Sequence, residues 1–152
     1  MATAAIGAVS TGTASAASIG PYKLCSADYI LGIGGYPCAY SNGQGNQIGM
    51  YGPSQSGVGP SYWYMPAYDS GYGNIQLYGT NLCMQLDASA GYIVIEATCN
   101  NITPQKWYFN SSNNSLTNEW NKGQCLTYNE DYERLDTVGC NGANYQYWLL
   151  FS

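Results

Sequence analysis

Three tryptophans recur at nearly equal intervals along the chain, each at a nearly fixed distance after a cysteine. The tryptophans are Trp63, Trp107 and Trp148, and the cysteines that precede them are Cys38, Cys83 and Cys125. The interval is roughly 40 residues, and a composite signal that returns at such a fixed period indicates copies of one supersecondary unit. We therefore predict three repeats, at about residues 22–65, 66–109 and 110–152, and any binding site can occur up to three times.

The six cysteines allow fifteen disulfide connectivities. In the last two repeats a second cysteine, Cys99 or Cys140, follows the first at nearly the same distance, so each of these repeats is predicted to close its own loop. The spacing thus favours one set of pairs: Cys83–Cys99, Cys125–Cys140 and, from the two that remain, Cys25–Cys38. An even number of cysteines in a small, loop-rich chain indicates an oxidising compartment, and the protein is predicted to be secreted.

Residues 1–19 are small and weakly apolar and contain Ala14-Ser15-Ala16, which resembles a signal-peptidase site. A positively charged start is missing, so the segment is either the remnant of a signal peptide or a disordered leader. In both cases the folded domain is predicted to span residues 20–152. No segment reaches the roughly 20 apolar residues that a membrane-spanning helix needs.

Charge and composition exclude several classes of function. The net charge is −5 with only four lysines and arginines, whereas a nucleic-acid surface needs clustered cations to neutralise phosphates. The chain has no histidine and no catalytic or metal-binding sequence motif, and its carboxylates are spread along the sequence. We predict no enzymatic activity, no cofactor and no metal. The sequence gives no indication of the oligomeric state.

Short extended stretches separated by clusters of Gly, Asn, Asp and Ser predict strands and turns throughout the chain. No segment sustains the apolar periodicity of an amphipathic helix, so almost no helix is expected. Each repeat is predicted to contain about four strands, including one at residues 29–31, 75–78 or 116–120. Such repeats bury an apolar face only by packing around a common axis. The predicted fold class is all-β with pseudo-threefold symmetry.

Local motifs add a family resemblance. Gln105-Lys106-Trp107 and Gln146-Tyr147-Trp148 resemble the Q-x-W signature of the ricin B-type lectins, and Ser61-Tyr62-Trp63 is a degenerate third copy. Residues 45–51, GNQIGMY, resemble the G-N-x-I-x-x-W/Y segment of the same family. The resemblance covers residues 22–152 and implies a β-trefoil, a six-stranded barrel capped by three hairpins.

The resemblance also implies roles for individual residues. The signature residues Trp63, Gln105, Trp107, Gln146 and Trp148 are expected to be structural. In the family, a sugar pocket uses a carboxylate two residues after the first cysteine and an aromatic ring in the next stretch. Here the carboxylate positions hold Tyr40, Gln85 and Thr127, and the ring positions hold Tyr51, Ala97 and Val138. No repeat keeps the acid, and only the first keeps the ring.

Two sets of residues are candidates for an altered sugar site. The first-repeat set combines rings and amides: Tyr40, Asn42, Asn46 and Tyr51. The third-repeat set combines carboxylates and amides: Asn129, Glu130, Asp131, Asp136, Asn144 and Gln146. The alternative for Asn42 and Asn46 is a role as turn residues, and the alternative for the third set is a solvated acidic turn. A core position for Tyr51 would contradict the first set.

The leading functional hypothesis is a secreted, non-catalytic carbohydrate-binding domain whose partners are glycans or cell-wall polysaccharide. The second is a protein-binding trefoil, such as a secreted protease inhibitor or a cell-surface interaction protein. An exposed loop with an apolar patch, for example at residues 62–66, would favour it. A trefoil that retains no ligand is the third.

Overall fold

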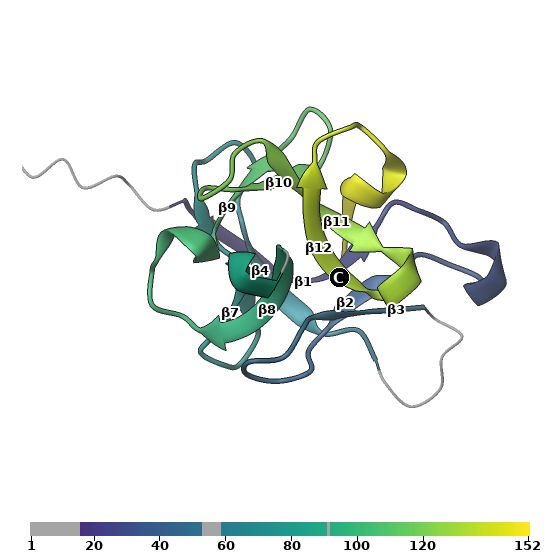
Figure 1. Cartoon of the computed structure of the whole chain (residues 1–152), viewed down its shortest axis with the longest axis horizontal. Coiled ribbons are helices and arrows are strands. Elements are labelled where there is room, and N and C mark those ends of the chain that lie inside the picture. Colours follow the sequence, from purple (N-terminus) through teal and green to yellow (C-terminus); the bar gives the residue numbers. More distant parts are fainter. Residues whose placement is uncertain (1–15, 53–58, 91) are drawn as a thin grey trace, which may run out of the picture.

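The computed structural model describes residues 16–52, 59–90 and 92–152, and this part of the chain is built from short strands and single 3-10 turns (Figure 1). The strands are β1 (Ser18–Ser26), β2 (Cys38–Tyr40), β3 (Gly49–Tyr51), β4 (Tyr62–Pro66), β5 (Gly73–Asn74), β6 (Gln76–Leu77), β7 (Leu82–Asp87), β8 (Ile93–Thr98), β9 (Lys106–Asn110), β10 (Ser115–Asn118), β11 (Gln124–Asn129), β12 (Arg134–Gly139) and β13 (Trp148–Phe151). The 3-10 turns are η1 (Leu31–Ile33), η2 (Ala88–Ala90), η3 (Thr103–Gln105), η4 (Glu130–Tyr132) and η5 (Asn144–Gln146). Within the described ranges, no helix has the length and hydrophobicity needed to cross a membrane.

All strand pairs are antiparallel, and together they close a ring of three repeats. One hairpin belongs to each repeat: β2–β3, β7–β8 and β11–β12. The hairpins meet, because β12 pairs with β3 at Arg134↔Gly49 and with β8 at Asp136↔Ile93. Figure 1 shows the three hairpins gathered around the centre of the view. The all-β class predicted from the repeats and the β-trefoil implied by the family resemblance are confirmed.

Each repeated tryptophan is fully buried, with 0% of its surface exposed. Each indole N–H also donates to a backbone carbonyl, since a buried Trp needs a partner for its polar edge. The acceptors are equivalent in the three repeats, each being the residue after the first cysteine. The bonds are Trp63 to Ala39 (3.4 Å), Trp107 to Met84 (3.0 Å) and Trp148 to Leu126 (3.1 Å). The regular spacing of the tryptophans therefore reflects the same packing of an indole ring in each of the three repeats.

Each repeat contains one disulfide, and the pairs are those that the spacing favours: Cys25–Cys38, Cys83–Cys99 and Cys125–Cys140. The first joins β1 to β2, and the other two join the ends of the β7–β8 and β11–β12 hairpins. Such bonds fit the oxidising environment of extracellular proteins.

The strand predicted at residues 29–31 is wrong. Ile30 makes only an isolated bridge with Gly35, and the chain then turns through η1 with Gly34 at φ +70°, a conformation that glycine adopts readily. The tip of this loop projects at the right of Figure 1, and Leu31 is 89% exposed there. Because the loop has no neighbour on which to form a longer ladder, it does not continue the sheet.

The predicted start of the folded domain at residue 20 is also too late. Ser18 and Ile19 belong to β1 and pair with Pro66 and Met65 of β4. The backbone of Ala17 accepts a hydrogen bond from Ala67 at 2.6 Å. The remainder of the predicted leader, residues 1–15, lies outside the described residues.

Candidate functional site

The glutamines of the two complete Q-x-W signatures organise equivalent turns in the second and third repeats. Both are buried. The Gln105 side chain accepts from the Asn100 N–H at 2.9 Å and donates to the Thr98 carbonyl at 2.9 Å. Gln146 repeats this arrangement with Asn141 at 2.9 Å and Gly139 at 3.1 Å. These amides complete the backbone hydrogen bonding of a buried turn, so they are unavailable to a ligand.

The same glutamines also donate hydrogen bonds to the side chains that stand at the family's carboxylate position. Gln105 Nε2 donates to Gln85 Oε1 at 3.0 Å, and Gln146 Nε2 donates to Thr127 Oγ1 at 3.1 Å. Thr127 in turn donates its hydroxyl to the Cys125 carbonyl at 2.8 Å. The replacements for the acid in these two repeats thus contribute to the fold.

The first-repeat set of candidates does not form an open sugar site. Tyr51 is only 9% exposed and meets the Tyr40 ring edge-on, with centroids 6.1 Å apart. Tyr40 lies directly over Gly49, where a Cβ would come within 2.2 Å of the ring. Asn42 Nδ2 donates to the Gln47 carbonyl at 2.8 Å, and Asn46 Nδ2 donates to the Asn42 carbonyl at 2.7 Å. The stacking role predicted for Tyr51 is wrong because its ring is packed away, and the two amides hold their own turn.

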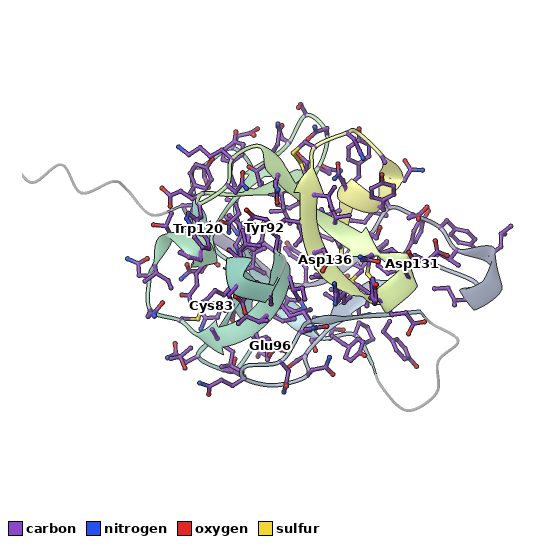
Figure 2. The ribbon with its side chains drawn as sticks, viewed as in Figure 1. Cys83, Tyr92, Glu96, Trp120, Asp131 and Asp136 are labelled. Carbon is purple, nitrogen blue, oxygen red and sulfur yellow. A yellow bond between two sulfur atoms is a disulfide. The ribbon has the colours of Figure 1, made fainter. Side chains whose placement is uncertain are left out.

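A buried carboxylate that sequence reasoning missed holds this turn from the neighbouring repeat. Glu96 of β8 is fully buried, and its oxygens accept from the Ser41 hydroxyl (2.7 Å) and the Asn42 and Gly43 N–H groups (2.7 and 3.2 Å). Figure 2 labels Glu96 beside the β8 ribbon. The turn it supports borders a shallow, open depression of about 550 Å³ lined by Asn42, Gly45, Asn46 and Gln47. The depression contains no aromatic ring, so it lacks a stacking surface.

The third-repeat set divides into three locations. Asp136 is buried, forms a salt bridge with Arg134 Nε at 2.8 Å and accepts from Asn129 Nδ2 at 2.6 Å. Gln146 is committed to its turn, and Asn144 is exposed in η5. Of the six residues of the set, Asn129, Glu130 and Asp131 line the pocket of this repeat. The structure therefore brings only part of the set together.

The third repeat nevertheless has an open pocket of about 310 Å³, here called the third-repeat pocket. Its lining residues are Asp28, Thr127, Tyr128, Asn129, Glu130, Asp131 and Tyr145. Figure 2 labels Asp131 on η4, at this side of the molecule. Among the described residues, the side-chain carboxylates of Asp28, Glu130 and Asp131 accept no hydrogen bond. They are thus available to donors from a ligand.

Two tyrosines line this pocket, and of these Tyr145 is the more exposed, since Tyr128 is buried. The Tyr145 side chain is half-buried against the core, and its hydroxyl accepts from Asn141 Nδ2 at 2.8 Å. The hydrogen bond fixes the ring from its polar end. The carboxylates do not converge on a metal position, since no group of three His, Cys, Asp or Glu side chains in the described part of the chain is arranged to hold a metal ion.

Burial and the nearby carboxylates raise the pKa of Tyr128, which lines this pocket. Burial, and then the charges of Glu130, Glu133 and Asp28, raise the pKa of this phenol to about 12 from its usual value near 10. The unfolded chain loses the Tyr128 proton above about pH 10, whereas the folded chain keeps it until about pH 12. The contribution of Tyr128 to stability is therefore complete below pH 10 and falls as the pH rises from 10 to 12.

We expect Tyr128→Phe to reduce this alkaline loss of stability. Denaturant titrations at pH 9 and pH 11 should show a smaller decrease in the free energy of unfolding for the variant than for the wild-type protein. Equal decreases would contradict the raised pKa as the cause.

The apolar loop suggested at residues 62–66 as a protein-binding element is not exposed. This segment is strand β4, in which Trp63, Met65 and Pro66 are buried. Only Tyr62 and Tyr64 face outward. Residues 62–66 therefore do not favour the inhibitor hypothesis.

Comparisons with known proteins agree with this architecture. A sequence profile of the ricin-type β-trefoil lectin domain matches residues 35–150. A designed threefold-symmetric protein, ThreeFoil, superposes with a TM-score of 0.65 at 16% identity, over 86% of this chain and 97% of that chain. A mosquitocidal holotoxin superposes with a TM-score of 0.66 at 15% identity, over 91% of this chain and 17% of the toxin chain. At such identities the structural likeness shows the fold alone. A sequence comparison with curated proteins found no match.

Proposed function

Because the chain belongs to the ricin-type β-trefoil lectin family, we propose that it is a secreted, non-catalytic carbohydrate-binding protein whose site is the third-repeat pocket. The single observation that carries the proposal is that three uncommitted carboxylates line the same open pocket as the Tyr145 ring, which is held by a hydrogen bond. The partner is a glycan or a cell-wall polysaccharide. Secretion is supported by the three disulfides.

The chemistry of the pocket suits a sugar. A carboxylate accepts two hydrogen bonds from neighbouring hydroxyl groups, and such charge-assisted bonds are stronger than neutral ones. The Tyr145 ring offers an apolar face to the C–H side of a pyranose, while its hydroxyl remains bonded to Asn141. The volume of about 310 Å³ is at the lower end of ligand pockets, so one sugar unit with its neighbour outside the pocket is the expected occupant.

The charge of the pocket also determines which glycans it takes. Asp28, Glu130 and Asp131 line it, and none of the described lining residues is a cation. Arg134 is held on Asp136 and over the Tyr132 ring, 4.5 Å from its centroid. Like charges brought together at an interface oppose binding, so sugars that carry a carboxylate should bind more weakly than neutral sugars or sugars with a protonated amine.

A glycan array followed by calorimetry tests the proposal. The array should contain neutral, amino-bearing and acidic oligosaccharides, and we expect binding to the first two classes. For the best ligand, Asp131→Asn should weaken the binding free energy by about 1.5–3 kcal/mol, the usual contribution of a hydrogen bond to a charged group. This corresponds to roughly a ten- to hundredfold rise in Kd.

Glu119→Gln is the matched control, because Glu119 lies outside the pocket lining and its carboxylate has no hydrogen bond in the described part of the chain. Its affinity should equal that of the wild-type protein. Unchanged affinity in Asp131→Asn would remove the third-repeat pocket from the proposal. No binding to any glycan at millimolar concentration would reject a carbohydrate function altogether.

Protein recognition is a second candidate function, and one observation favours it. The β1–β2 loop exposes Leu31 at its tip and carries the Tyr29 and Tyr36 rings, which contact each other edge-on at 5.2 Å. Tyr36 also stacks on Phe151 at 6.2 Å. Exposed apolar groups that gather on one surface are typical of interaction sites. Saturable inhibition of a protease that disappears in Leu31→Ser would support this function, and unaffected protease activity would remove it.

A further inference from the structure

A second, smaller pocket lies on the outside of the barrel, far in sequence from the acidic residues described above. It has a volume of about 150 Å³ and is lined by Ala16, Ser18, Tyr64, Pro66, Asn74 and Gln76. We call it the outer-face pocket. It shares no lining residue with the third-repeat pocket.

Strand register explains why these six residues meet. Ser18 of β1 pairs with Pro66 of β4, and Tyr64 of β4 pairs with Gln76 of β6. Side chains alternate between the two faces of a strand, and the intervening residues Trp63, Met65 and Ile75 are fully buried in the core. The five strand residues of the pocket, from β1, β4, β5 and β6, therefore lie on the side of their strands away from this core, and Ala16 lies just before β1. A site on paired strands has a rigid base.

The pocket contains a polar atom whose bonding is incomplete. The side-chain oxygen of Asn74 is buried and has no hydrogen-bond partner in the described part of the chain. A buried acceptor without a donor is costly to the fold, and in proteins such atoms are normally satisfied by water or by a ligand. Gln76, at the other side of the pocket, is already engaged, since its Nε2 donates to the Thr80 carbonyl at 2.7 Å. Asn74 is thus the group that requires a donor.

A patch of tyrosines continues the pocket along the same face of the sheet. The Tyr64 ring contacts Tyr78 with centroids 5.7 Å apart, and Tyr78 lies beside Tyr62 through a backbone hydrogen bond of 2.9 Å. Tyr62 and Tyr78 are 39% and 56% exposed. Lys23 Nζ stands 5.5 Å from the Tyr62 ring centroid. In this tyrosine patch, Tyr62, Tyr64 and Tyr78, the rings of Tyr64 and Tyr78 meet edge-on, and the Lys23 ammonium lies over the Tyr62 ring.

We propose that the outer-face pocket is a second ligand site, which takes one neutral, hydroxylated ring such as the end unit of a saccharide. A ligand hydroxyl donates to Asn74 Oδ1, and the following units lie on the tyrosine patch. The pocket is smaller than typical ligand sites, whose volumes begin at roughly 300 Å³, so only a single ring enters it. Rings with polar edges are suited to ligands that have C–H faces and hydroxyl rims. This site does not depend on the third-repeat pocket.

Nuclear magnetic resonance of the isotope-labelled full chain tests the proposal with glucose, xylose and N-acetylglucosamine as probes. The Asn74 side-chain amide and the Tyr64 ring signals should shift saturably at millimolar concentrations of at least one probe. Asn74→Leu should weaken that binding at least tenfold and leave the melting temperature unchanged or raised, because the replacement removes the unpartnered oxygen. Tyr78→Ala should weaken the binding of an oligosaccharide of the same sugar several-fold.

Tyr29→Ala is the control for Tyr78→Ala, since Tyr29 is an exposed tyrosine on the β1–β2 loop. It should leave binding at the outer-face pocket unchanged. Asp131→Asn should also leave the Asn74 and Tyr64 shifts intact, which separates this site from the third-repeat pocket. Absence of saturable shifts at Asn74 with all three probes, or unchanged binding in Asn74→Leu, would overturn the proposal and assign water alone to the pocket.

Discussion

Replacing Trp107 by alanine should lower the free energy of unfolding by about 3–5 kcal/mol, the usual cost of removing a buried aromatic side chain. The indole is fully buried, and its N–H donates to the Met84 carbonyl at 3.0 Å. The change would therefore leave a cavity at the centre of the barrel and an unpaired carbonyl beside it. Domains of this size have a total stability of about 5–15 kcal/mol, so the loss is a large fraction of the free energy of unfolding and should clearly lower the denaturant midpoint.

Denaturant unfolding followed by circular dichroism measures this loss, and the fourth tryptophan provides the control. Trp120, labelled in Figure 2, lies outside the repeat pattern and is 53% exposed. Trp120→Ala should change the free energy of unfolding by no more than about 0.5 kcal/mol, as is usual for surface positions. Similar losses for the two variants would mean that the tryptophan period does not identify the core.

Glu96→Ala should cost about 3 kcal/mol, the second largest effect that we expect from a single substitution, because it leaves hydrogen-bond donors unpaired. Three donors from the turn of the first repeat point at the Glu96 carboxylate. Removal of the acceptor leaves them in a partly buried place, and each such group costs about 1–3 kcal/mol when it is not rehydrated. Because water can reach part of this turn, we expect the total loss to stay well below three times the largest penalty for one unpaired group.

Amide hydrogen exchange shows where this loss arises. The Asn42 and Gly43 amides should exchange faster in Glu96→Ala, while the amides of the β11–β12 hairpin should change only with global stability. Glu96→Gln should lose less stability than Glu96→Ala, because its amide oxygen still accepts from a backbone N–H. Glu119→Ala is the control for the loss of a carboxylate. An unchanged exchange rate at Asn42 and Gly43 would show that Glu96 does not hold the turn.

Features that belong to a single repeat could be predicted from the sequence. The tryptophans and cysteines identified the three repeats because each repeat buries one ring and closes one loop in the same way, and the family resemblance of the motifs implied the trefoil. The two buried glutamines followed from the same signature. These residues contact partners inside their own repeat, so the same sequence pattern recurs from repeat to repeat.

Features made by two repeats were not predictable in this way. Glu96 lies in the second repeat but holds a turn of the first, 53 to 55 residues earlier. Asp28 lies in the first repeat but lines the pocket of the third. Tyr51 matches the family position for a stacking ring, yet the neighbouring Tyr40 and the core leave it little exposed surface. Alignment of the repeats with one another contains no information about such contacts between them.

The first described strand is held by the last one. β1 pairs with β13 from Lys23↔Phe151 to Ser26↔Trp148, as well as with β2 and β4. This ladder joins residues that are separated by almost the whole described sequence, and contacts of such long range form late and slow folding. During synthesis the barrel cannot close until β13 has left the ribosome. A nascent chain without β13 therefore exposes the unpaired edge of β1, which makes β13 decisive for escape from aggregation.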